Sequence, residues 1–156
     1  MKRLYLRIIA VLALTAVFAS GAHAAAPTQV AAPAPTVETY RNLATSRCLD
    51  SNTSGRVYTL GCNGGAFQKW IVLVNRDGTR SFRNLATSRC LDSNTAGNAY
   101  TLACNGGSFQ KWKIIRNRDS TTITFRNLAT GRCLDSNTAG NTYTLACNGG
   151  SFQRWR

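Results

Sequence analysis

Three groups of residues in this sequence combine side chains that can bind a polar ligand. In each group an aspartate is followed eight and ten residues later by a tyrosine and a leucine, and an asparagine comes just after the next cysteine. The groups are Asp50, Tyr58, Leu60 and Asn63; Asp92, Tyr100, Leu102 and Asn105; and Asp135, Tyr143, Leu145 and Asn148. A carboxylate accepts charge-assisted hydrogen bonds, an amide both donates and accepts, and a tyrosine beside a leucine offers apolar surface with a polar end. Such a set would suit the hydroxyls and C–H patches of a sugar ring.

The same residues also have ordinary structural explanations. The Asp-Ser-Asn run could shape an Asx-type turn, and asparagine before two glycines is typical of a turn. Tyrosine and leucine in a strand usually pack in a core. Alternation places Tyr58 and Leu60 on one face of a strand and Thr59 on the other, but it does not say which face is buried. The residues alone leave binding and packing open.

The sequence contains few side chains that could act in catalysis. Its one histidine, His23, lies near the start of the chain, so the rest has no imidazole base. Each group contains one acid, whereas glycoside hydrolysis needs two carboxyl groups about 5–10 Å apart. No Cys-x-x-Cys pair of the kind that binds zinc is present. We therefore predict a protein that is not an enzyme and that uses neither cofactor nor metal.

The three groups belong to a repeat. The segments Cys48–Trp70, Cys90–Trp112 and Cys133–Trp155 are nearly identical, and each follows the lead-in Arg-Asn-Leu-Ala-Thr. Short apolar and alternating runs between glycine-containing turns predict four strands and no helix in each repeat. Propellers need at least about four blades. Three repeats therefore predict an all-β barrel with pseudo-threefold symmetry, in which the two ends of the chain meet.

The start of the chain predicts export. Basic residues, an apolar run and an Ala-His-Ala site indicate a signal peptide over residues 1–24. Residues 25–36 form an alanine- and proline-rich leader, and the domain covers residues 37–156, with repeats of about 37–78, 79–120 and 121–156. We expect a secreted protein without stable membrane insertion.

Six cysteines in an exported chain predict a disulfide framework. Threefold repetition leaves two symmetric schemes, one within the repeats and one between neighbouring repeats. We favour the first, because each bridge closes a 15-residue loop that a hairpin can bring together. The predicted pairs are Cys48–Cys62, Cys90–Cys104 and Cys133–Cys147.

The Gln-x-Trp motifs reveal a family resemblance. Gln68-Lys69-Trp70 and its two copies resemble the signature of the ricin B-type β-trefoil lectin family. The repeats are most similar to those of three-repeat actinomycete lectins that bind mannose. The resemblance covers all three repeats and implies a β-trefoil with three pseudo-symmetric four-stranded units, each with an internal disulfide.

This resemblance also assigns the site. It implies that the aspartate, tyrosine, leucine and asparagine of each repeat contact a sugar, in three equivalent sites for terminal mannose of high-mannose glycans. Phe67, Phe109 and Phe152 depart from the tyrosine usual before the glutamine. The aromatic that galactose-binding relatives have two residues before the second cysteine is leucine here, so galactose is not expected. We assign the three tryptophans to the core.

The charge supports two alternatives. The formal net charge is +13, and loss of three basic residues with the signal peptide leaves about +10. A cationic protein that binds anionic polymers is therefore an alternative, as is a trefoil that binds a protein partner or acts as an inhibitor. The basic residues recur in each repeat instead of forming one stripe, so nucleic acid is not a predicted partner. We expect the protein to be a monomer and its partners to be glycans or polysaccharides.

Overall fold

The computed structural model describes residues 34–156, which form eleven strands and three short 3₁₀ turns. The predicted signal peptide (1–24) and most of the predicted leader (25–36) lie outside the described residues. The strands are β1 (Thr36–Glu38), β2 (Cys48–Ser51), β3 (Val57–Leu60), β4 (Trp70–Val74), β5 (Arg80–Asn84), β6 (Cys90–Ser93), β7 (Ala99–Leu102), β8 (Trp112–Arg116), β9 (Ile123–Asn127), β10 (Cys133–Ser136) and β11 (Thr142–Leu145). The turns are η1 (Ala66–Gln68), η2 (Ser108–Gln110) and η3 (Ser151–Gln153). No helix in the described part of the chain is long and apolar enough to cross a membrane.

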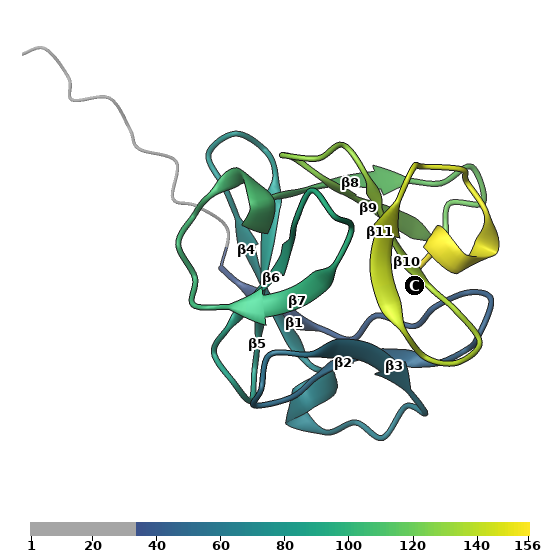
Figure 1. The fold of residues 1–156 in the computed structure, drawn as a ribbon, viewed down its shortest axis with the longest axis horizontal. Helices are drawn as coiled ribbons and strands as arrows, with labels where there is room; N and C mark the ends of the chain where they lie inside the picture. Colours follow the sequence, from purple (N-terminus) through teal and green to yellow (C-terminus); the bar gives the residue numbers. More distant parts are fainter. Residues whose placement is uncertain (1–33) are drawn as a thin grey trace, which may run out of the picture. The chain divides into compact units, whose positions relative to one another are not determined.

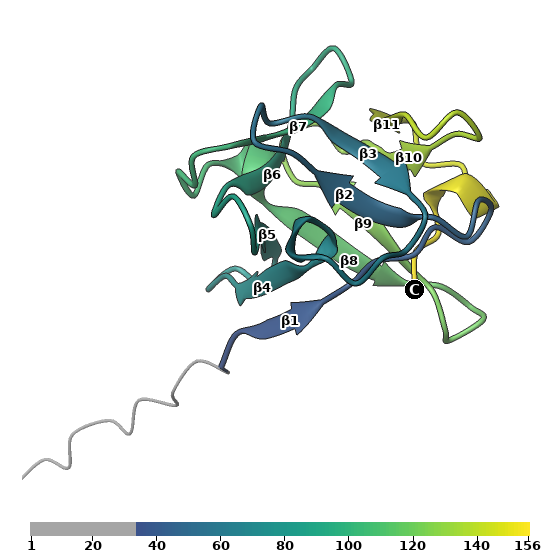
Figure 2. The same cartoon turned by 90° about the horizontal axis from the view of Figure 1, so that it is seen from below.

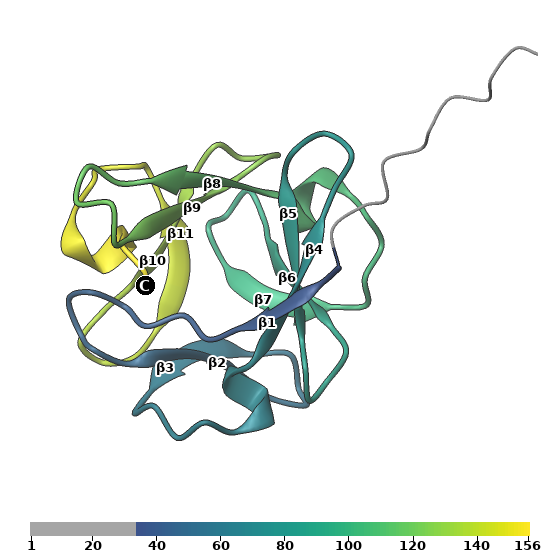
Figure 3. The ribbon, with the colours of Figure 1, turned by 180° about the vertical axis from the view of Figure 1, so that it is seen from behind.

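The first and last strands of the repeats form a closed barrel. Antiparallel pairing runs from β1 to β4, β5, β8 and β9. The fourth strand of the last repeat is reduced to Trp155, which bridges Ile123 on one side and Asn42 on the other. Arg41 and Arg156 exchange backbone hydrogen bonds of 2.7 and 2.9 Å. The two ends of the domain therefore meet as predicted, beside the barrel strands seen in Figure 3.

The two middle strands of each repeat form a hairpin. The hairpins β2–β3, β6–β7 and β10–β11 share the same register of four residue pairs. Figure 1 shows them arranged around a common centre, and Figure 2 shows them on one side of the barrel strands β4, β5, β8 and β9. A barrel capped by three hairpins with pseudo-threefold symmetry is a β-trefoil, so the predicted fold class is confirmed.

Neighbouring hairpins are joined in a ring by one backbone hydrogen bond each. The three bonds run from Thr101 N to Gly55 O (2.8 Å), from Thr144 N to Gly97 O (2.7 Å) and from Thr59 N to Gly140 O (2.8 Å). At Gly97 an added Cβ would lie 2.8 Å from Thr144 O, and the backbone has φ +93°. Glycine is therefore required at this contact, because other residues rarely adopt a positive φ and would collide with the neighbouring strand.

Aromatic residues fill the centre of the barrel. Trp70, Trp112 and Trp155 are fully buried, which confirms their assignment to the core. The rings of Tyr40 and Phe82, from the first two repeats, each pack edge-on against Phe125, with centroids 4.8 Å apart. Each indole also needs a hydrogen-bond acceptor once it is buried. That acceptor is the backbone carbonyl of the leucine in the Cys-Leu-Asp-Ser strand of the same repeat.

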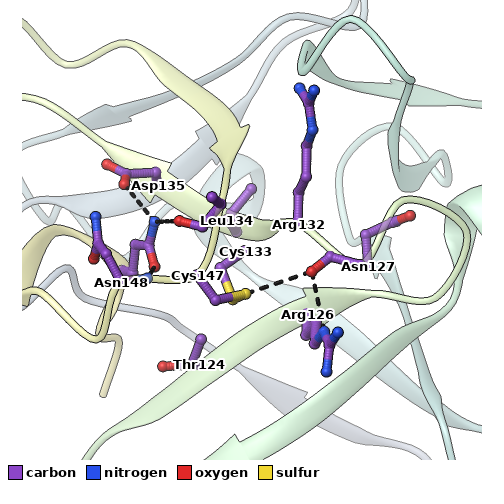
Figure 4. Close-up of a disulfide and its surroundings, with 12 residues drawn as sticks. Thr124, Arg126, Asn127, Arg132, Cys133, Leu134, Asp135, Cys147 and Asn148 are labelled. Atoms are coloured by element: carbon purple, nitrogen blue, oxygen red, sulfur yellow. Dashed lines mark hydrogen bonds between the residues drawn. A yellow bond between two sulfur atoms is a disulfide. The ribbon is translucent and has the colours of Figure 1, made fainter.

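The disulfides join the two cysteines within each repeat, so the predicted pairing is confirmed. Each bridge connects the start of a hairpin to the loop that follows it. Figure 4 shows the third of them, between Cys133 and Cys147, with Asp135 and Asn148 on the same side of the bridge. The bridge thus holds together the two chain segments that supply these predicted site residues.

Candidate functional site

The predicted aspartate and tyrosine of each repeat face each other across a hairpin. In the second repeat Asp92 on β6 is directly opposite Tyr100 on β7. Burial and the negative charge of Asp92 raise the pKa of Tyr100, so this hydroxyl stays protonated at neutral pH. The pairs Asp50–Tyr58 and Asp135–Tyr143 have the same register.

The tyrosine and leucine of each hairpin point away from the core. Thr101, between them in β7, is 1% exposed, whereas Tyr100 is half-buried and Leu102 is 43% exposed. Strand alternation therefore places the threonine inward and the two larger side chains outward. Packing in the core, the alternative explanation for these residues, is wrong.

A buried glutamine fixes the aspartate and the asparagine. Gln110 Nε2 donates to Asp92 Oδ2 at 2.9 Å and to Ala103 O at 3.0 Å, and its Oε1 accepts from Asn105 N at 2.9 Å. One side chain thus joins strand β6 to the loop after the second cysteine. A carboxylate has about four acceptor positions, so Asp92 keeps capacity for a ligand.

The asparagine presents its amino group. Asn105 Oδ1 accepts a 2.7 Å hydrogen bond from Gly107 N, while Asn105 Nδ2 has no hydrogen-bond partner among residues 34–156. A Cβ on Gly107 would lie 2.9 Å from Asn105 Oδ1, so a larger residue there would displace the asparagine side chain. The predicted turn role of the asparagine and its predicted binding role are therefore compatible, since they use different atoms of the amide.

These residues surround a pocket of about 240 Å³ in the second repeat. It is lined by Asp92, Ser93, Asn94, Tyr100, Leu102, Asn105, Gly107 and Phe109. All four residues predicted for this repeat are brought together. Asp92, the only acid among the lining residues, is 3% exposed, and Leu102 and the 40% exposed Phe109 are the apolar side chains of the wall.

The first and third repeats reproduce this geometry. Gln68 and Gln153 donate to Asp50 and Asp135 at the same distance of 2.9 Å. Asn63 and Asn148 each use the side-chain oxygen to accept from a glycine two residues on. Leu60 and Leu145 are 47% and 45% exposed. The chain therefore has three copies of one arrangement, each built within a single repeat.

The electrostatics suit binding of hydroxyl groups. Burial raises the pKa of Asp92 and of Asp135 above the ordinary value, although the hydrogen bonds from Gln110 and Gln153 act in the opposite direction. A buried carboxylate accepts strong hydrogen bonds.

Sequence reasoning missed the glutamines and the further residues of the wall. The glutamine was identified only as part of a family motif, although each one follows its aspartate by 18 residues in every repeat. Phe109 was noted only as a departure from tyrosine, yet its exposure makes it part of the pocket. The recurrence of a phenylalanine directly before the glutamine in all three repeats could have indicated this role.

Comparisons with known proteins agree with this fold. The family model described as ricin-type beta-trefoil lectin domain matches residues 36–155. The designed threefold-symmetric protein ThreeFoil superposes with a TM-score of 0.71 at 21% identity, over 77% of this chain and 96% of that one. SeviL, in its structure bound to asialo-GM1 saccharide, gives 0.67 at 12% identity, over 76% of this chain and 93% of that one.

A third similar structure is a larger enzyme. An exo-beta-1,3-galactanase from Clostridium thermocellum gives a TM-score of 0.71 at 20% identity, over 78% of this chain but 29% of the enzyme. At such identities the likeness to these structures is one of fold.

Proposed function

The chain belongs to the ricin-type beta-trefoil lectin domain family. We propose that it is a secreted, monomeric lectin with three equivalent sites for terminal mannose of high-mannose glycans. The observation that supports the proposal most is the combination, in each repeat, of a buried carboxylate held by glutamine with an outward-facing tyrosine and leucine. Exposed leucines at three equivalent positions have no role in the core. They suit a ligand with an apolar face.

Each side chain has a distinct role in the proposed complex. The carboxylate of Asp92 accepts hydrogen bonds from two neighbouring sugar hydroxyls, and Asn105 Nδ2 donates to one of them. Tyr100 and Leu102 contact the C–H face of the ring, and the tyrosine hydroxyl adds a polar contact. Asp92 and Asn105 are already positioned by Gln110, so ligand binding requires little reorganisation of the site.

The choice of mannose is supported by the sequence. The repeats resemble those of mannose-binding three-repeat lectins, and they lack the aromatic residue that galactose-binding relatives have two residues before the second cysteine. Leu60, Leu102 and Leu145 occupy this place. Stacking of a galactose ring on an aromatic side chain is therefore not available at that position.

Three sites on one rigid domain favour multivalent binding. A shallow pocket of about 240 Å³ gives weak affinity for one sugar. Simultaneous occupation of several pockets by a branched glycan or a dense surface raises avidity by about 10²–10⁴-fold. We therefore expect strong binding to polyvalent mannose surfaces and weak binding to the monosaccharide.

The protein is proposed to be non-catalytic. The likeness to a galactanase covers only 29% of that enzyme, and the pocket of the second repeat has a single acid. The saccharide in the SeviL structure supports sugar binding by this kind of fold. The alternative function is binding of anionic polymers, which the formal net charge of +13 favours.

A glycan array at two salt concentrations separates these functions. We expect binding to mannose-terminated glycans that is unchanged by salt and inhibited by free methyl α-mannoside. Binding of anionic polymers should instead fall steeply as salt rises. The combined variant Leu60→Ala, Leu102→Ala and Leu145→Ala should lose mannose binding, and it should remain folded because the three leucines are exposed. Salt-sensitive binding to sulfated glycans without mannose binding would overturn the proposal.

A further inference from the structure

A second type of pocket lies where the three hairpins meet. It has a volume of about 340 Å³ and is lined by residues 54–57 of the first repeat, 98–100 of the second and 141–142 of the third. Figure 1 shows the hairpins that supply these residues arranged around the centre of the trefoil. No single repeat can form this pocket, which distinguishes it from the pocket of the second repeat described above.

Backbone pairing brings equivalent residues of the three repeats to this axis. The isolated bridges are Arg56 with Tyr100, Asn98 with Tyr143, and Asn141 with Tyr58. In each bridge, the residue before a hairpin's second strand pairs with the tyrosine of a neighbouring repeat. Arg56, Asn98 and Asn141 therefore form a ring around the pseudo-threefold axis.

The polar side chains of this ring lack partners. Within residues 34–156, the guanidinium of Arg56 and the amides of Asn98 and Asn141 make no hydrogen bond or ion pair, and all three residues are exposed. The two ion pairs among residues 34–156 join Lys111 to Asp77 and Arg154 to Asp119. These groups are therefore available to a ligand.

A buried hydroxyl beside the ring also lacks a partner. Thr142 is 8% exposed, and its Oγ1 is buried without any hydrogen bond in the described part of the chain. The equivalent residues, Val57 and Ala99, are apolar, so the fold does not require a hydroxyl here. An unpaired buried hydroxyl is costly, and a ligand in the pocket that Thr142 lines would satisfy it.

The charge of the pocket selects the ligand. Its lining includes one cation, Arg56, and no acid, and the two asparagines and Thr142 can all donate hydrogen bonds. Guanidinium groups pair in a fork with carboxylate, sulfate or phosphate oxygens. Its volume is at the lower end of the range for small-molecule sites. We propose that this axial pocket binds an oxyanion, the carboxylate or sulfate group of an acidic saccharide, as a fourth site of a different specificity.

This proposal is independent of the neutral-sugar sites, although one residue connects the two kinds of pocket. Tyr100 lines both the axial pocket and the pocket of the second repeat. Binding of an oxyanion at the axis should therefore change the NMR signal of Tyr100 even when no mannose is present.

The test is an NMR titration of the ¹⁵N-labelled protein with sodium sulfate, glucuronate and neutral methyl glucoside at constant ionic strength. We expect saturable shifts at Gly55, Asn98 and Thr142 with the two anions and none with the neutral sugar. Tighter binding of glucuronate than of sulfate supports an acidic saccharide as the ligand. Equal or tighter binding of sulfate would mean that the pocket binds a free inorganic anion, and it would overturn the assignment to a saccharide. Failure of both anions to bind would overturn the proposal.

Matched variants locate the site. Arg56→Asn gives the first repeat the residue of the other two, so the fold is retained, and anion affinity should fall about tenfold because a charge-assisted hydrogen bond is lost. Arg118→Asn removes the same charge from an exposed position outside the pocket and should leave the affinity unchanged. Thr142→Val should weaken binding without lowering the melting temperature. Equal affinities of the Arg56→Asn and Arg118→Asn proteins would contradict the assignment.

Discussion

Gln68 Nε2 lies 2.9 Å from Asp50 Oδ2, and two residues later Trp70 Nε1 lies 3.1 Å from the carbonyl oxygen of Leu49. The Gln-x-Trp motif therefore holds two consecutive residues of strand β2. The glutamine positions the carboxylate at the pocket, and the tryptophan anchors the residue before it to the core. The motif thus connects the packing of the barrel to the geometry of the proposed sugar site.

The first prediction concerns this glutamine. Gln110→Ala leaves Asp92 Oδ2 and the backbone N–H of Asn105 without their partner. We expect the free energy of unfolding to fall by about 1–3 kcal/mol, the cost of unsatisfied buried groups, and the affinity of this site for mannose to fall as well. Urea denaturation measures the first effect. Lys111→Ala is the control, because it removes an exposed ion pair with Asp77 and should cost no more than about 1 kcal/mol. Equal losses of unfolding free energy in Gln110→Ala and Lys111→Ala would show that the glutamine does not hold the site.

Much of the fold could be predicted from the sequence because the repeats restrict it. Three copies excluded a propeller and implied pseudo-threefold closure, and the cysteine spacing favoured the observed pairing. The orientation of Tyr58 and Leu60 could not be predicted, because alternation gives relative faces only. The contact of Gln68 with Asp50 spans 18 residues and depends on how η1 packs against β2. The axial pocket depends on contacts between repeats, which periodicity does not reveal.

The second prediction separates binding from packing among the leucines. Leu102→Ala should weaken mannose binding at the second repeat and leave the melting temperature unchanged, because Leu102 is 43% exposed. Leu91→Ala, the control, removes a fully buried side chain and should cost about 2–5 kcal/mol of stability. Calorimetric melting and sugar titration of both variants check this. A marked loss of stability in Leu102→Ala would mean that this residue belongs to the core.

The third prediction concerns the ring of hairpin contacts. Gly97→Ala should destabilise the domain by about 2–4 kcal/mol, from the left-handed backbone and from overpacking against Thr144. Gly106 also has a positive φ, of +69°, but an added Cβ there has nothing within 4 Å. Gly106→Ala should therefore cost only about 1–2 kcal/mol. Gly61 lacks both features, and its replacement by alanine should have almost no effect. Chemical denaturation ranks the three variants, and any other order would contradict the close contact between repeats.

The fourth prediction is a pH dependence. Burial raises the pKa of Asp92 and Asp135, so their carboxylates become protonated at a higher pH than the ordinary value of about 3.9. The charged form is the one that the folded protein disfavours, so protonation of these two groups does not destabilise the fold. Mannose affinity should decrease on acidification before the ordinary aspartate range is reached, while the melting temperature changes little. Titrations from about pH 7 to about pH 4, paired with circular dichroism melts, test this. Constant affinity across that range would argue against the role of the carboxylates.

The most direct test of the central claim is an NMR titration with methyl α-mannoside that follows the amide signals of Asn63, Asn105 and Asn148. We expect all three to shift and saturate, one for each repeat. The combined variant Asp50→Ala, Asp92→Ala and Asp135→Ala should abolish the three responses, and Asp92→Asn, which keeps an acceptor for Gln110, should abolish only that of the second repeat. Unchanged mannose binding by the folded triple variant would contradict the proposed sites.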